Sequence, residues 1–104
     1  YKGEPKVDID RIREIDRVVS VPLVLHGSSG VPYDTLEKAV GAGIRKINID
    51  TDIRASFAGA VKSFVAENPE EIDPRKILKP ARAAMAETVK EKIKVFGSDA
   101  KAWK

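Results

Sequence analysis

The chain has 104 residues, with no cysteine and with 19 lysines and arginines against 16 aspartates and glutamates, so its net charge is only +3. This length suits one hydrophobic core, so we expect residues 1–104 to belong to a single domain, and the absence of cysteine excludes disulfides and thiolate metal sites. The basic residues are scattered through amphipathic segments, which argues against a nucleic-acid partner, and no apolar stretch approaches the roughly 20 residues that span a bilayer. Because the sequence also opens without a signal-like segment, we expect a cytoplasmic protein.

The first half of the sequence alternates helix and strand patterns. Residues 8–20 place apolar side chains three or four positions apart in an otherwise charged segment, which predicts a surface helix capped by Asp8. Residues 21–26, VPLVLH, form a continuous apolar run typical of a strand buried on both faces. Residues 32–43 begin with a proline at the first helical position and end at two glycines, which predicts a second, short helix.

The second half continues with one more strand and two longer helices. Residues 44–50, IRKINID, predict a buried strand with a polar end. The segment from residue 51 onward carries apolar side chains on one helical face until Asn68-Pro69 ends the pattern. The last helix is predicted from about Pro80 to Phe96. The side chains expected to point inward from these two helices are Ile53, Phe57, Ala60, Val61, Phe64, Val65, Met85, Val89, Ile93 and Phe96.

Strands that alternate with helices indicate βαβ units and a parallel sheet. Only two strands are predicted, however, and a two-stranded parallel sheet leaves peptide groups unpaired at its edges. The chain therefore either borrows strands from copies of itself or forms part of a larger barrel, and we favour the barrel.

Polar residues follow both predicted strands at their carboxyl ends, where functional groups collect in parallel α/β folds. His26, the only histidine, precedes a Gly-Ser-Ser-Gly loop, whose backbone N–H groups and hydroxyls can face an anion. The segment Asn48–Thr51 opens a helix, whose first N–H groups offer a second surface for an anion. Taken singly, the loop is equally typical of an ordinary strand-to-helix turn and the histidine of a structural imidazole, so both interpretations stay open at this point.

Three segments in this order carry a resemblance to a known family: VPLVLHGSSGVP, GAGIRKINIDTDIR and DPRKILKPARAAMAETVKEKIKVFGS. They resemble strand 7, strand 8 and the last helix of the class II, zinc-dependent fructose-bisphosphate and tagatose-bisphosphate aldolases, which are (β/α)8 barrels. The opening YKGEPKVDIDRI resembles the segment after the family's second-last zinc histidine. The resemblance implies an α/β fold in which residues 1–104 are the carboxyl-terminal portion of one (β/α)8 TIM barrel, with about two parallel strands and four to five helices.

The resemblance also implies roles for individual residues. His26 matches a histidine that binds the catalytic zinc, and Asn48 matches a residue whose amide touches the substrate near the metal. The positions that match the family's phosphate-binding residues are Lys2, Gly27, Ser28, Ser29, Asp50 and Thr51. The backbone near Lys2 and Gly27 also matches the site of a monovalent cation, Na⁺ or K⁺. Arg54 and Arg75 resemble basic residues that reach the distal phosphate, in some members across a subunit boundary, and are equally typical of a solvated helix arginine and a capping-region arginine.

Two departures from the family pattern limit what this chain can do. Ser28 stands where glycine or alanine is usual, which the loop should tolerate because the contact there comes mostly from backbone N–H groups. More seriously, one histidine cannot hold a catalytic zinc. The other zinc ligands and the acid/base aspartate are expected upstream of Tyr1, so residues 1–104 alone contain no catalytic residue and are expected to be inactive.

The implied activity is the reversible cleavage of fructose 1,6-bisphosphate to dihydroxyacetone phosphate and glyceraldehyde 3-phosphate, in glycolysis and gluconeogenesis, by a homo-oligomeric lyase, a dimer or tetramer. A tagatose-bisphosphate aldolase is the first alternative, since NIDTDIR is closer to fructose-type members and FAGAVKSFVAENP to tagatose-type ones. A non-enzymatic segment that binds phosphate or mediates assembly is the second. The third, a basic nucleic-acid binder, would show a steep salt dependence.

Overall fold

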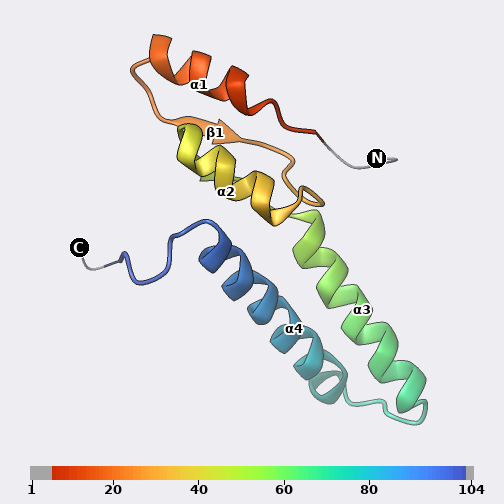
Figure 1. The fold of residues 1–104 in the computed structure, drawn as a ribbon. Coiled ribbons are helices and arrows are strands. Elements are labelled where there is room, and N and C mark those ends of the chain that lie inside the picture. Colours follow the sequence, from red (N-terminus) through yellow and green to blue (C-terminus); the bar gives the residue numbers. More distant parts are fainter. Residues whose placement is uncertain (1–5, 103–104) are drawn as a thin grey trace. The chain divides into compact units, whose positions relative to one another are not determined.

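The computed structural model describes residues 6–102, which form four helices and two strands (Figure 1). In chain order these are α1 (Ile9–Val18), β1 (Leu23–Leu25), α2 (Tyr33–Ala42), β2 (Ile44–Ile47), α3 (Thr51–Glu67) and α4 (Pro74–Val95). The chain divides into two compact units. The first contains α1, β1, α2 and β2 together with the residues from 93 onward, and the second contains residues 50–92.

The first unit is built on a parallel pair of strands, as the sequence predicts. Leu23 of β1 lies opposite Ile44 of β2, and Leu25 lies opposite Ile47. The buried residues that form its core are Ile12, Ala39, Ala42 and Ile44. Because these come from α1, α2 and β2, one apolar cluster holds two helices against the sheet.

The helix ends of this unit follow from local chemistry. The carboxylate of Asp8 accepts a hydrogen bond from the Arg11 N–H at 3.0 Å, which confirms the predicted cap of α1. Pro32 precedes α2 as its N-cap, one position earlier than predicted. Gly43 ends α2 with φ +134°, and a Cβ at this position would lie 2.6 Å from the Asp16 Cγ. Glycine is therefore required here both by the backbone conformation and by the close approach of α1.

The prediction that the strands are buried on both faces is wrong for the described residues. Leu23 and Leu25 pack against the core, whereas Val24, between them, is 41% exposed. Arg45 and Lys46 of β2 are exposed as well. Successive side chains of a strand point to opposite faces, and within residues 6–102 the core cluster covers one face only.

In the second unit, α3 and α4 run antiparallel (Figure 1). The Lys92 ammonium lies 2.7 Å from the Asp52 carboxylate. One turn later in α3 and one turn earlier in α4, the hydroxyls of Ser56 and Thr88 are hydrogen-bonded to each other. These two polar contacts join the start of α3 to the last turns of α4.

The predicted start of α4 at Pro80 is wrong, because the helix begins at Pro74. The Asp73 carboxylate accepts a hydrogen bond from the Arg75 N–H at 2.9 Å, and the Asp73 carbonyl accepts the N–H groups of Lys76 and Ile77. Proline is favoured at the first helical position and does occupy it here, but the sequence contains two prolines, Pro74 and Pro80, that could do so. Pro80 instead lies inside the helix.

The two long helices are less buried than their apolar stripes predict. Every residue of α3 is at least partly exposed, and Val65, Val89 and Ile93 are each more than a third exposed. Among the described residues, no helix combines the length and apolar character needed to cross a bilayer.

Candidate functional site

His26 and Asn48 lie side by side at the carboxyl ends of the paired strands. Each directly follows its strand, and the pairing of Leu25 with Ile47 aligns the two ends. The Asn48 Nδ2 is 2.8 Å from the His26 Nδ1. This contact joins the imidazole to the residue that follows β2. The imidazole is exposed and the asparagine half-buried.

The loop after His26 is anchored to the end of β2 by a serine hydroxyl. Ser28 is 1% exposed, and its Oγ donates a hydrogen bond of 2.9 Å to the Asn48 carbonyl oxygen. Gly27 and Gly30 on either side have φ values of +62° and +81°, in the left-handed region that favours glycine. Since the Ser28 hydroxyl is engaged inside the protein, this position can offer a ligand its backbone rather than its side chain. Ser29, the next residue, is half-buried.

In the second unit, three of the predicted phosphate-binding residues lie at the start of α3. The Asp50 carbonyl accepts the N–H groups of Ile53 and Arg54, and Thr51 is the exposed first residue of the helix. The Asp50 carboxylate forms an ion pair of 2.9 Å with the Arg54 guanidinium, and both side chains are largely exposed. An exposed pair of this kind contributes little net stability, so an incoming anion can compete with Asp50 for Arg54.

Arg75 lies at the other end of the helical pair. Its guanidinium donates two hydrogen bonds to the Asp73 carboxylate, at 3.1 and 2.9 Å. These bonds, with the backbone bond from the same residue, hold the pKa of Asp73 below its usual value. A helix rises 1.5 Å per residue, so Arg75 is about 25 Å along α4 from Lys92, the residue that contacts the start of α3. The structure therefore does not bring Arg75 together with Asp50, Thr51 and Arg54.

The described residues can supply a zinc ion with one ligand. Neutral imidazole is a good zinc ligand, and the exposed ring of His26 fits that use. Within residues 6–102, however, no group of three or more His, Cys, Asp or Glu side chains could hold a metal ion. His26 could therefore fill one position of a zinc site, and the described residues do not supply a complete one. Lys2, the other predicted phosphate contact, lies outside the described residues.

The Asp52–Lys92 pair was not predicted from the sequence. A signal for it was present, because Lys92 falls on the apolar stripe of α4 formed by Met85, Val89 and Phe96, at a spacing of three or four from its neighbours. A lysine at such a position is either exposed by the packing or buried with a partner.

Comparison with known proteins places this geometry in a family. The family model described as "Fructose-bisphosphate aldolase class-II" matches residues 1–101. The crystal structure of the YdjI aldolase from Escherichia coli K12 is 38% identical, with a TM-score of 0.79, and the match covers 94% of this chain. The fructose-bisphosphate aldolase of Campylobacter jejuni is 21% identical over 93% of this chain, with a TM-score of 0.76, which bears on the fold alone.

This chain spans 36% of the length of each of those two proteins. The predicted portion of a (β/α)8 barrel is confirmed: residues 6–102 contain two parallel strands and four helices, where about two strands and four to five helices were expected. The match over nearly all residues also confirms the resemblance noted in the sequence. The chain belongs to the class II fructose-bisphosphate aldolase family.

Proposed function

We propose that this chain forms the phosphate-binding part of the active site of a zinc-dependent ketose-bisphosphate aldolase, at the carboxyl-terminal end of its barrel. The reaction is the reversible cleavage of fructose 1,6-bisphosphate to dihydroxyacetone phosphate and glyceraldehyde 3-phosphate. The observation that carries the proposal is the contact between His26 and Asn48 at adjoining ends of two parallel strands, in a chain of this family. Polar groups at that edge of a (β/α)8 barrel are where its active sites form.

The proposed roles follow the chemistry of each side chain. His26 supplies one zinc ligand, and Asn48 orients its ring and touches the substrate near the metal. Zinc, when bound, acts as a Lewis acid that polarises the substrate carbonyl. The remaining ligands and the acid/base aspartate come from other parts of the barrel.

The phosphate of the dihydroxyacetone half is bound by the loop after β1 and by the start of α3. The contributing residues are Lys2, Gly27, Ser28, Ser29, Asp50 and Thr51. A Na⁺ or K⁺ ion sits near the backbone of Gly27. Arg54 contacts the distal phosphate. Arg75, in the first turn of α4, reaches the active site of a neighbouring copy in a dimer or tetramer. The oligomer is located in the cytoplasm.

Metal analysis of the full-length protein tests the histidine assignment. The loss of a residue that merely orients a ligand costs about 10–100-fold in metal affinity, so His26→Ala should cost more than about 100-fold and recover activity only partly at high zinc. Ser29→Ala serves as the control, because it alters the same loop and should keep its zinc. Full zinc occupancy with near-normal turnover in His26→Ala would return the residue to a structural role.

A kinetic comparison of two sugars tests the substrate. Fructose 1,6-bisphosphate should have a larger kcat/KM than tagatose 1,6-bisphosphate, because the C4 hydroxyl in which they differ is read by polar groups near the strand ends, where the fructose-like NIDTDIR lies. A larger value for tagatose would assign the protein to that sugar. Phosphate binding without cleavage of either would indicate a non-enzymatic role.

A further inference from the structure

The second unit contains a lysine that is buried beside the start of α3. The Lys92 side chain is 9% exposed, and its Nζ lies 2.7 Å from Oδ2 of Asp52, the second residue of α3. Lysine is almost never buried unless it is paired. An ion pair that is largely removed from solvent also adds little stability over apolar side chains of similar volume, because its charges lose much of their hydration. The pair therefore calls for a role other than holding two helices together.

A second polar contact fixes where the ammonium lies. The Ser56 hydroxyl donates to the Asp52 carbonyl oxygen at 3.0 Å, so in the hydrogen bond between Ser56 and Thr88 it is the Thr88 hydroxyl that donates. Thr88 and Lys92 are one turn apart on α4, as Asp52 and Ser56 are on α3. The hydroxyl pair thus sets the register of the two helices and holds Lys92 at the first turn of α3.

The charge of Lys92 affects the net charge of the first turn of α3. Asp50 and Asp52 bring two carboxylates, and Arg54 brings one guanidinium, which is paired with Asp50. Without Lys92 the turn would carry a net negative charge. This charge would offset the partial positive charge of the helix start, which favours the binding of an anion. Because Lys92 is largely removed from solvent, its charge is screened less than that of the exposed pair.

We propose that Lys92 is a positioning residue that neutralises Asp52 and thereby allows the start of α3 to accept the phosphate group of a sugar phosphate. This inference rests on the proposed function, since it assigns a supporting residue to the same phosphate site. Lys92 acts through Asp52 and does not itself contact the ligand.

Removal of each charge singly distinguishes this role from helix packing. The full-length protein is titrated with inorganic phosphate by calorimetry, and its melting temperature is measured. Lys92→Met and Asp52→Asn should both lower the melting temperature, because each removes one charge of the ion pair between α3 and α4. Their phosphate affinities should change in opposite directions, about fivefold weaker for Lys92→Met and about fivefold tighter for Asp52→Asn, as expected for one unit charge near a bound anion at a partly hydrated site.

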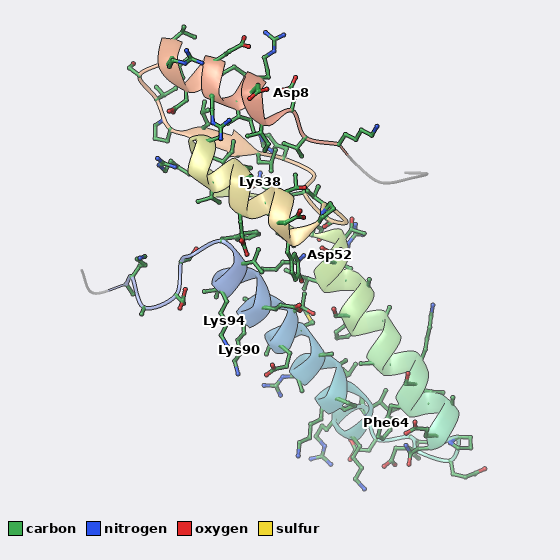
Figure 2. All side chains as sticks on the ribbon, viewed as in Figure 1. Asp8, Lys38, Asp52, Phe64, Lys90 and Lys94 are labelled. Carbon is green, nitrogen blue, oxygen red and sulfur yellow. The ribbon has the colours of Figure 1, made fainter. Side chains whose placement is uncertain are left out.

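Three further variants control the measurement. Lys92→Arg keeps the charge and should keep the phosphate affinity. The double variant Lys92→Met/Asp52→Asn removes both charges and should return the affinity close to that of the unchanged protein. Lys90→Met removes a lysine from the same helix, on the side facing away from α3, where it is paired at the surface with Glu87, and should leave binding and melting unchanged (Figure 2).

Equal weakening of phosphate binding in both single variants would overturn the inference, because a structural role moves them together. Unchanged binding in both would overturn it as well. If instead the unchanged protein binds no phosphate, or Ser29→Ala binds it as well as the unchanged protein does, the phosphate site of the proposed function itself is wrong. The two failures are therefore distinguishable.

Discussion

Two neighbouring serines in the loop after β1 are expected to do different work. The buried Ser28 hydroxyl ties the loop to the Asn48 carbonyl, whereas Ser29 is half-buried and is the proposed side-chain contact to phosphate. In the full-length protein, Ser28→Ala should lower the free energy of unfolding by about 1 kcal/mol, the usual net value of one hydrogen bond, and leave the substrate KM unchanged. Ser29→Ala should raise KM, by an amount that corresponds to about 1.5–3 kcal/mol, the value of a hydrogen bond to a charged group.

Denaturant unfolding and steady-state kinetics on the two variants check this pair of expectations, and each variant is the control for the other. The same shift in KM for both would mean that Ser28 also reaches the ligand through its side chain. The sequence pointed to both positions as phosphate contacts, with the contact at Ser28 expected mostly from its backbone, but it did not show where the Ser28 hydroxyl lies. The direction of the Ser28 hydroxyl depends on Asn48, twenty residues away, and no local pattern encodes that contact.

At the scale of helices and strands, the sequence succeeds where an element ends through its own chemistry. Asp8 caps α1, Gly43 ends α2 with a positive φ, and Asn68 follows the last residue of α3, all within one or two residues of the prediction. It fails at the start of α4, because both Pro74 and Pro80 suit a first helical position. Hydrogen bonds to Asp73 fix the start of the helix at Pro74. The spacing of apolar residues does not predict these bonds.

That capping residue gives a prediction about pH. Arg75 holds the pKa of Asp73 below its usual value, mainly through the side-chain hydrogen bonds and secondly through the backbone one. A carboxyl whose pKa is lowered on folding stabilises the folded state above its unfolded pKa, and the stabilisation is lost as the pH falls through the folded value. The start of α4 should therefore stay capped through the normal titration range of aspartate and loosen only below it.

Carbon NMR of the Asp73 carboxyl, with amide exchange at Lys76 and Ile77, measures both parts of this prediction in the full-length protein. Asp73→Asn is the matched variant, because an amide oxygen can still accept the Arg75 N–H but has no charge to lose. Exchange at the two amides should then no longer depend on the protonation of residue 73. An Asp73 carboxyl that titrates at or above the value of an unstructured peptide would contradict the assignment.

At the scale of the whole molecule, the alternation of elements predicted the parallel pairing, whereas the predicted burial of both strand faces is not met among residues 6–102. Val24 and the outer side chains of β2 have no covering layer among residues 6–102. A continuous apolar run such as VPLVLH indicates a strand with two buried faces in the complete fold. The apolar pattern of the strand thus indicates that elements other than the described residues pack against this sheet.

These uncovered surfaces lead us to expect that residues 1–104, prepared alone, self-associate or remain partly molten. Besides Val24, the strongly exposed apolar residues include Val18, Val21 and Ile72. In the second unit Phe64, Pro80 and Ala83 also line an apolar hollow of about 450 Å³. Contiguous apolar patches above about a few hundred Å² rarely stay in water, and a two-stranded sheet leaves both edges open to pairing with another chain.

Sedimentation velocity and a thermal melt of the isolated chain measure this directly. We expect species larger than a monomer, increasing with concentration, and a broad transition. Val24→Lys should reduce the association, since a charge on the uncovered face of the sheet opposes pairing with a second copy. Arg45→Lys, a change on the exposed part of β2 that keeps its charge, should leave the association unchanged. A monodisperse monomer with a sharp cooperative melt would show instead that the two units satisfy their own apolar surfaces, and that the barrel contributes active-site residues rather than stability.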